Sequence, residues 1–232
     1  MKLAVMQPYL FPYIGYFQLI NAVDRFVIYD DVNFIKKGWI NRNNILVNGK
    51  ANLFTVPLKN ASQNKLIRDI EISAIYDWKK DLLKTIELSY RKAPCYEEVF
   101  EFISRIINNV EINISGYIYH SLVQINRFLN IDTEIVRTSS IYKNRLLKQQ
   151  NRIIDICKKE NSGEYINPIG GLELYSKKLF RENEIDLYFI KTNKIVYRQF
   201  NNEFAGSLSI IDVMMFNPKE RIKEFLNDYE LI

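Results

Sequence analysis

The chain has 232 residues, enough for one domain with a sizeable core, and 47% of them are hydrophobic, which excludes a disordered chain. Its net charge of +5 arises from 32 Lys and Arg against 27 Asp and Glu, dispersed without a five-residue block of like charge, so nucleic acid is not indicated as a partner. Two cysteines and one histidine argue against a disulfide framework and against a metal site.

The N-terminal residues predict a β-α-β unit. Residues 3–6 form a short apolar run that is typical of a buried parallel strand, residues 14–22 have helical spacing, and residues 25–29 resume a β-like run. The apolar start is interrupted by Gln7, Pro8 and Pro12 before it reaches the ~18 residues of a membrane span, and it lacks a cleavage site, so we expect no membrane span and a cytoplasmic location.

The middle of the chain predicts a β-hairpin followed by helices. Asn48-Gly49 between two apolar runs is a strong hairpin signal. Apolar stripes at helical spacing then cover residues 78–90, 97–109 and 114–128. We therefore expect residues 76–130 to form a helical insertion or cap within a single α/β domain that covers residues 1–232.

The C-terminal part returns to alternating strands and helices. We expect strands at 134–136, 164–166 and 187–190, and helices at 145–160, 208–216 and 220–226. A further helix, which ends at Phe180, is expected after a Gly170-Gly171 loop. The predicted fold is therefore α/β, with a mostly parallel sheet that opens with β-α-β, a β-hairpin, and a helical insertion or cap.

The loop after the first strand has an unusual density of prolines and tyrosines. Prolines stiffen it, while tyrosines can stack on a flat ligand and donate hydrogen bonds. The loop also leads into a helix N-terminus, which favours an anion. We predict that it binds substrate, through Gln7, Tyr9, Tyr13 and Tyr16. The alternative is a tight aromatic turn that packs under the sheet.

The layout of this loop is similar to that of nucleotidylyltransferases, whose signature contains two histidines. The corresponding residues here are Tyr13-Ile14-Gly15-Tyr16, without either histidine. A tyrosine with its usual pKa of about 10 is only a neutral donor towards a transferring phosphate. Adenylyl transfer therefore remains an alternative that rests on the β-α-β layout alone.

Polar and aromatic residues also follow the second strand. Because parallel strands of a β-α-β unit end at the same edge of the sheet, these residues are expected beside the first loop. We predict that substrate is bound there by Asp30, Lys37, Trp39, Asn41 and Arg42. For the lysines in this segment, a solvated loop is the alternative.

Two residues are candidates for moving a proton. Asp31 follows the second strand, where a carboxylate can accept a proton from an amine, and His120 is the only histidine. We predict these two as catalytic, with an ordinary packed or surface residue as the alternative for His120.

Two C-terminal segments complete the predicted site. Tyr197 and Gln199 are predicted to bind substrate where their loop meets the N-terminal loop. Ser209, three residues before Asp212, resembles a helix-capping pair, which gives that segment a structural alternative.

Several short motifs, in order along nearly the whole chain, resemble the WbqC-like protein family. They are Gln7-Pro8-x-x-Phe11-Pro12-x-x-Gly15-Tyr16, Asp30-Asp31, Asn41-Arg42, Tyr90-x-x-Ala93-Pro94, Tyr165, Gly170-Gly171, Tyr197-x-Gln199 and Leu208-Ser209-Ile210-x-Asp212. The resemblance implies a bacterial protein encoded among genes for surface polysaccharide, such as O-antigen, where amino sugars are built and decorated.

Three functions remain open on this basis. The first is an acyl- or aminoacyltransferase that forms an amide on a nucleotide-linked amino sugar, with Asp31 or His120 accepting the amine proton. Its donor would be an acyl thioester on coenzyme A or a carrier protein, without a metal. The second is ATP-dependent activation of a carboxylate, and the third is a non-catalytic nucleotide-sugar binding protein. A homodimer is compatible with each.

Overall fold

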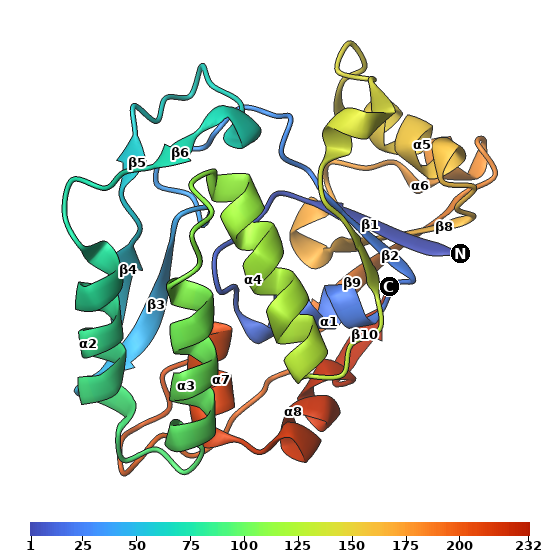
Figure 1. Cartoon of the computed structure of the whole chain (residues 1–232). Helices are drawn as coiled ribbons and strands as arrows, with labels where there is room; N and C mark the ends of the chain where they lie inside the picture. Colours follow the sequence, from blue (N-terminus) through green and yellow to red (C-terminus); the bar gives the residue numbers. More distant parts are fainter.

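A six-stranded sheet lies at the centre of the computed structural model, which describes residues 1–232 (Figure 1). The strand order is β10-β9-β8-β1-β2-β7, and only β10 is antiparallel to its neighbour. The predicted α/β class with a mostly parallel sheet is confirmed. The strands are β1 (Lys2–Met6), β2 (Arg25–Ile28), β7 (Glu134–Val136), β8 (Glu164–Pro168), β9 (Asp186–Thr192) and β10 (Tyr229–Leu231).

The order of the strands determines where loops gather. From β1 the chain proceeds through α1 (Ile14–Asn21) to β2 on one side of β1, whereas β8 pairs with the other side. The register aligns Val5 with Val27, so β1 and β2 end beside each other. In open α/β sheets, ligands bind outside the carboxyl ends of such strands. The loops after β1, β2, β8 and β9 all leave from this edge.

Two hydrophobic cores cover the two faces of the sheet. Side chains of β1 alternate between them: Ala4 belongs to the larger core, while Leu3 and Val5 belong to the smaller one. The smaller core lies under α5 (Gln149–Lys159) and α6 (Lys177–Arg181). The larger core is covered by α1, α7 (Ile210–Phe216) and α8 (Lys219–Leu226). None of the helices combines the length and the apolar character that a membrane crossing requires.

In the helical segment, α2 (Trp78–Tyr90) and α3 (Tyr96–Ile107) lie on one side of the molecule, whereas α4 (Ile114–Phe128) lies near the middle of the view (Figure 1). In α2, Trp78, Leu82, Ile86 and Tyr90 recur every four residues and are all buried, which explains why this segment is helical. Asp77 caps its N-terminus by accepting a hydrogen bond from the backbone of Lys80. The three helices contribute to the larger core that also covers the sheet. That residues 76–130 are an insertion within one domain stays a prediction.

The predicted hairpin is present as β3 (Arg42–Val47) and β4 (Lys50–Thr55). Asn48 and Gly49 connect the strands with φ angles of 51° and 75°, the left-handed values that this two-residue turn requires. A shorter antiparallel pair, β5 (Leu58–Lys59) with β6 (Glu71–Ile72), follows it and was not predicted.

Two helix starts and one missed strand differ from the prediction for local reasons. The helix expected from residue 145 begins at Gln149, because Lys148 is extended and Leu146 and Leu147 are exposed rather than facing the sheet. The last strand, β10, was missed because it is a three-residue edge strand with little hydrophobic pattern. The helix expected from residue 208 begins at Ile210.

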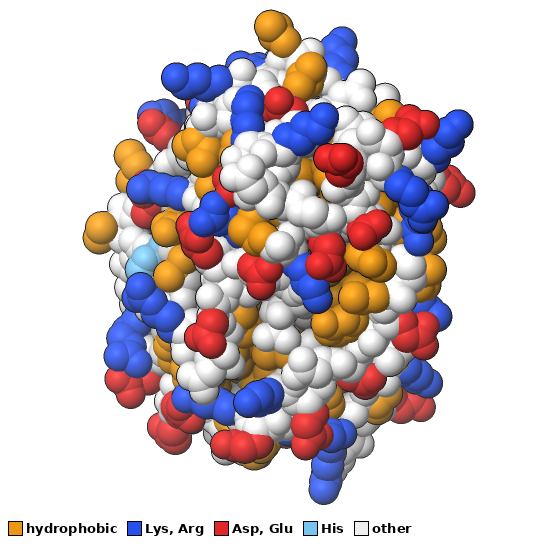
Figure 2. Space-filling model, turned by 90° about the vertical axis from the view of Figure 1, so that its right-hand side faces the viewer, with side chains coloured by type: hydrophobic (Ala, Val, Ile, Leu, Met, Phe, Trp, Pro, Cys, Tyr) orange, Lys and Arg blue, Asp and Glu red, His pale blue; other side chains and the backbone are white.

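Charges of both signs alternate over the surface. Figure 2 shows Lys and Arg side chains interspersed with Asp and Glu side chains over one face of the molecule. Most of the ion pairs join exposed side chains, where they add little to stability. This face therefore lacks the continuous basic surface that binding along a nucleic-acid backbone requires.

Candidate functional site

Two adjoining pockets lie where the loops after β1, β2 and β9 meet. The first, of about 310 Å³, is lined by aromatic and polar side chains: Tyr9, Pro12, Tyr13, Trp39, Asn43 and Ser207. The second, of about 420 Å³, also borders Tyr13 and Ser207 and extends along residues 192–197. Because they share these two residues, we treat the pockets as one site and call it the aromatic cleft.

Buried hydrogen bonds fix the loop that forms one wall of the cleft. Phe11 has a φ of 42°, which is unusual for a side chain of its size. Its carbonyl accepts hydrogen bonds from the Asn43 amide at 2.9 Å and the Ser209 hydroxyl at 2.7 Å. The neighbouring Pro12 carbonyl accepts from the Ile210 backbone at 2.8 Å. The hairpin and the start of α7 therefore hold this loop in place from the inside.

The aromatic side chains of the cleft differ in exposure. Tyr13 and Trp39 are 41% and 44% exposed, and Tyr9 is half-buried. Tyr16, in contrast, is buried, and its hydroxyl donates to the Gln7 backbone carbonyl at 2.8 Å. Burial raises the pKa of Tyr9 and of Tyr13, so both phenols remain neutral hydrogen-bond donors near pH 7. The predicted aromatic loop thus presents Tyr9 and Tyr13 to solvent and uses Tyr16 as support.

The segment after β2 carries Trp39 on a tied loop. The Arg42 guanidinium donates to the backbone carbonyls of Lys37 and of Gly38, the latter at 2.9 Å, and lies 6.0 Å from the Trp39 ring centre. The Asn41 amide donates to the Val56 carbonyl at 2.7 Å. Arg42 and Asn41 therefore stabilise the loop itself, while the Lys37 side chain is exposed. Their contact with a substrate stays a prediction.

Asp30 lies just beyond the end of β2 and is buried. Its carboxylate accepts hydrogen bonds from the Ser115 hydroxyl at 2.8 Å and the Thr138 hydroxyl at 2.6 Å. Burial raises the pKa of Asp30 above its ordinary value, although these hydrogen bonds oppose the shift. Asp30 thereby joins β2 to the start of α4 and to the segment after β7.

Asp31 forms a buried ion pair with Arg152 of α5. The two side chains are 1% and 4% exposed, and Arg152 Nη2 lies 2.5 Å from Asp31 Oδ1. The Ser139 hydroxyl donates to the same oxygen, whereas Oδ2 has no partner. The guanidinium also stacks 4.7 Å from the Tyr29 ring centre. Asp31 is therefore enclosed in this conformation, and its predicted role as a proton acceptor stays a prediction.

The predicted catalytic His120 lies on α4. Its side chain is half-buried, and it borders neither pocket of the aromatic cleft. The structure brings Tyr9, Tyr13 and Trp39 together. It places Asp31 in the ion pair with Arg152 of α5, and His120 on α4, away from the cleft. Seven predicted residues of the first two loops do not line the cleft: Gln7, Tyr16, Asp30, Asp31, Lys37, Asn41 and Arg42.

A second buried carboxylate supports the C-terminal wall of the cleft. Asp212 of α7 is fully buried and accepts hydrogen bonds from the hydroxyls of Tyr90 at 2.8 Å and Tyr197 at 2.6 Å, and from the Gln199 amide at 2.7 Å. Burial raises its pKa against the opposing effect of these bonds. Gln199 also closes its own loop by pairing with the backbone of Ala205.

Of the suggested capping pair Ser209 and Asp212, only Ser209 acts as a helix cap. Ser209 caps α7 by accepting a hydrogen bond from the Ile211 backbone at 3.2 Å, but the Asp212 carboxylate turns to Tyr90 and Tyr197 instead. Tyr197 borders the second pocket of the cleft, and Gln199 does not line it. Both are held by the same carboxylate.

Three residues that line the cleft were not predicted from the sequence. Asn43 is a polar residue on a strand, Ser207 has a positive φ of 57°, and Lys194 is the only charged residue that lines either pocket. Asn43 had one usable signal, since a buried amide on a strand needs partners and here finds them in the N-terminal loop.

Comparison with known proteins agrees with the sequence motifs. The sequence profile of the WbqC-like protein family matches residues 7–224. An uncharacterized protein, Rv1507c, from Mycobacterium tuberculosis is 27% identical over 229 residues, covering 97% of each chain. No solved structure shows significant similarity. Tyr90, Tyr197, Gln199 and Asp212, which come from three of these motifs, meet in one network. The chain belongs to the WbqC-like protein family.

Proposed function

We propose that the protein binds a nucleotide-linked amino sugar in the aromatic cleft and transfers an acyl or aminoacyl group to its amine. The observation that supports this most is the exposure of Tyr13 and Trp39 in one pocket at the carboxyl edge of the sheet. Aromatic faces stack on sugar rings and bases, and a hydroxyl such as that of Tyr13 can bind sugar oxygens.

The two pockets suit different parts of such a ligand. Each has the volume of a small-molecule site, for which about 300–1,000 Å³ is usual. Lys194 borders the second pocket and forms no ion pair within the protein, so its ammonium group is free to meet a diphosphate. We therefore assign the sugar to the pocket of Tyr9, Tyr13 and Trp39, and the diphosphate to the side of Lys194.

The transfer reaction needs little from the protein beyond positioning. The amine nitrogen attacks the thioester carbonyl, the C–N bond forms as the C–S bond breaks, and the leaving thiolate takes up the proton that the nitrogen loses. An amine with a pKa of about 8, like that of an α-amino group, is partly neutral at pH 7, and holding it against a thioester can itself lower the barrier by several kcal/mol. Coenzyme A or a carrier protein is the proposed source of the thioester.

A non-catalytic nucleotide-sugar binding protein is the second candidate. It is favoured by the lining of the cleft, which contains neither a carboxylate nor an imidazole. The two candidates make the same prediction for binding and opposite predictions for turnover.

The test combines binding with mass spectrometry. Titration with UDP-glucosamine should saturate, and Trp39→Ala should weaken binding by about tenfold or more, since one stacked ring contributes ~1–3 kcal/mol. Ile141→Ala is the control, because Ile141 is 57% exposed and borders neither pocket of the cleft. Equal affinity in the Trp39 variant and the wild type would contradict the binding site.

Turnover is measured with acetyl, succinyl and aminoacyl thioesters. A product heavier by the acyl group, formed from UDP-glucosamine and not from UDP-N-acetylglucosamine, supports transfer to the amine. Binding without any product across these donors supports the non-catalytic candidate instead.

A further inference from the structure

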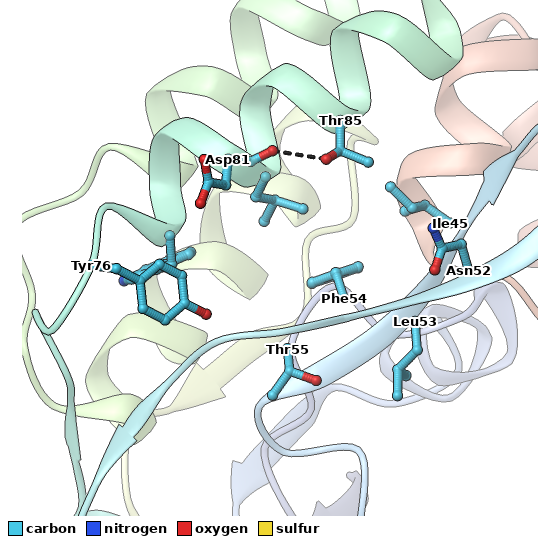
Figure 3. A pocket seen from close by; sticks show the side chains of 10 residues that line it. Ile45, Asn52, Leu53, Phe54, Thr55, Tyr76, Asp81 and Thr85 are labelled. Atoms are coloured by element: carbon cyan, nitrogen blue, oxygen red, sulfur yellow. Dashed lines mark hydrogen bonds between the residues drawn. The ribbon is translucent and has the colours of Figure 1, made fainter.

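A pocket of about 260 Å³ lies between the β3–β4 hairpin and α2 (Figure 3). It borders neither the Asp31 pair nor the aromatic cleft, and none of its lining residues is assigned a role above. The lining side chains come from both elements and from the segment that enters α2: Ile45, Asn52, Leu53, Phe54, Thr55, Tyr76, Trp78, Asp81, Leu82 and Thr85.

The floor of this pocket is apolar and its rim is polar. Ile45, Trp78 and Leu82 are 1%, 6% and 6% exposed, so they form a fixed base. Figure 3 shows that Tyr76 and Asp81 lie close together at one end of the pocket, with the hairpin opposite them. A polar edge over an apolar base is the usual construction of a site for a small ligand.

Asp81 carries the only charge in the lining and has no partner. Its side chain is exposed and forms neither an ion pair nor a hydrogen bond, and only its backbone carbonyl is used, accepting from Thr85 Oγ1 at 2.8 Å. The nearby Lys79 is occupied elsewhere, because its ammonium group donates to the Asn109 carbonyl. The lining of the pocket therefore carries one negative charge, which forms no ion pair within the protein, beside aromatic rings.

From this arrangement we propose that the pocket binds a small ligand with a primary ammonium group, of the size of one amino acid or one amino sugar. The ammonium group pairs with the Asp81 carboxylate and contacts the Tyr76 ring, and the body of the ligand packs against Phe54, Trp78 and Leu82. The volume lies just below the ~300 Å³ at which sites for drug-sized ligands begin, which favours a ligand smaller than a nucleotide. The negative charge disfavours phosphates.

The two tryptophans of the chain allow this proposal to be tested separately from the aromatic cleft. Trp78 borders this pocket and Trp39 borders the cleft, so their indole N–H signals in ¹⁵N-¹H spectra report the two sites independently. A Trp39→Phe variant identifies which signal belongs to which residue. The probes are phenethylamine and glucosamine, with 2-phenylethanol and glucose as uncharged counterparts.

The proposal predicts that the amines shift the Trp78 signal in a saturable way, while the uncharged counterparts bind about two- to fivefold more weakly. Asp81→Asn should reduce amine affinity to that of the uncharged probes. Glu87→Gln, which removes a carboxylate on the same helix outside the pocket, should bind the amines like the wild type.

Three results would overturn it: unchanged amine affinity in Asp81→Asn, equal affinity for charged and uncharged probes, or no shift of the Trp78 signal. A response of Trp39 alone would place amine binding in the aromatic cleft, which would support that site and refute this one.

Discussion

Tyr90 offers a direct test of the buried network around Asp212. Its hydroxyl donates to Asp212 Oδ1 at 2.8 Å and accepts from the Leu46 backbone N–H at 2.7 Å, and the side chain is fully buried. Tyr90→Phe keeps the ring but removes both hydrogen bonds. The Leu46 N–H then lies buried without an acceptor, and the carboxylate loses one of its three donors.

The magnitude follows from these two losses. An unsatisfied buried backbone group costs about 1–3 kcal/mol, and a hydrogen bond to a charged group contributes about 1.5–3 kcal/mol. We expect a decrease of about 3 kcal/mol in the free energy of unfolding. At roughly 2–4 °C per kcal/mol for a chain of this size, Tm should fall by about 6–12 °C.

Thermal unfolding followed by circular dichroism measures this change. Tyr96→Phe is the matched control, because Tyr96 stacks on Phe100 while its hydroxyl makes no hydrogen bond, and its Tm should remain within about 2 °C of the wild type. A Tm for Tyr90→Phe that is equally close to the wild type would refute the reasoning, since it would mean that the hydroxyl of Tyr90 carries neither bond in solution.

Three other substitutions test different contacts by the same measurement. Arg152→Met leaves Asp31 buried without its counter-charge and should cost about 3–5 kcal/mol, most of which the double variant with Asp31→Leu should recover; no recovery would contradict the pair. Asp30→Asn tests pH dependence. Burial raises the pKa of Asp30 in the folded protein, so the protonated carboxyl group stabilises the fold below about pH 4, and this contribution is lost as pH rises through the folded pKa. Because Asn does not titrate, the Tm of the variant relative to the wild type should increase between pH 4 and pH 7. A constant difference would contradict the shift. Gly49→Ala should cost about 1 kcal/mol or more, because φ is 75° and the new methyl group would lie 2.8 Å from Asn202 Cγ; an unchanged Tm would show that the turn relaxes.

Local patterns predicted most of the fold because they depend on nearby residues. The four-residue spacing of Trp78, Leu82, Ile86 and Tyr90 identified α2 with its observed bounds, and Asn48-Gly49 identified the hairpin. The predicted start of α7 at residue 208 was wrong, because Ser209 caps the helix and α7 begins at Ile210. The apolar spacing over residues 208–216 does not reveal where such a cap starts the helix.

The aromatic cleft could be predicted only in part. The β-α-β pattern places the loops of β1 and β2 at one edge of the sheet, so the proximity of Tyr9 and Tyr13 to Trp39 followed from topology. Topology did not predict the direction in which each side chain points. Tyr9, Tyr13 and Tyr16 look alike in the sequence, yet only Tyr16 is buried.

Charged residues were the hardest to interpret because their partners are remote. Asp31 and Arg152 are 121 residues apart, and Asp212 receives a hydrogen bond from Tyr90 across 122 residues. A single sequence contains no pattern at such separations. The position of Asp31 after a strand could be predicted, but its ion pair with Arg152 of α5 could not.

The buried carboxylates stabilise the fold and do not line the aromatic cleft. Asp30, Asp31 and Asp212 each lie buried among donors that join distant segments, and none borders the aromatic cleft. Tyr197 is the exception that connects the two roles, since it borders the cleft while its hydroxyl donates to Asp212. Because Tyr90 shares that carboxylate, loosening the network should also move a wall of the cleft. A loss of UDP-glucosamine affinity in Tyr90→Phe, measured well below its Tm, would show that the network positions the binding surface as well as stabilising the fold.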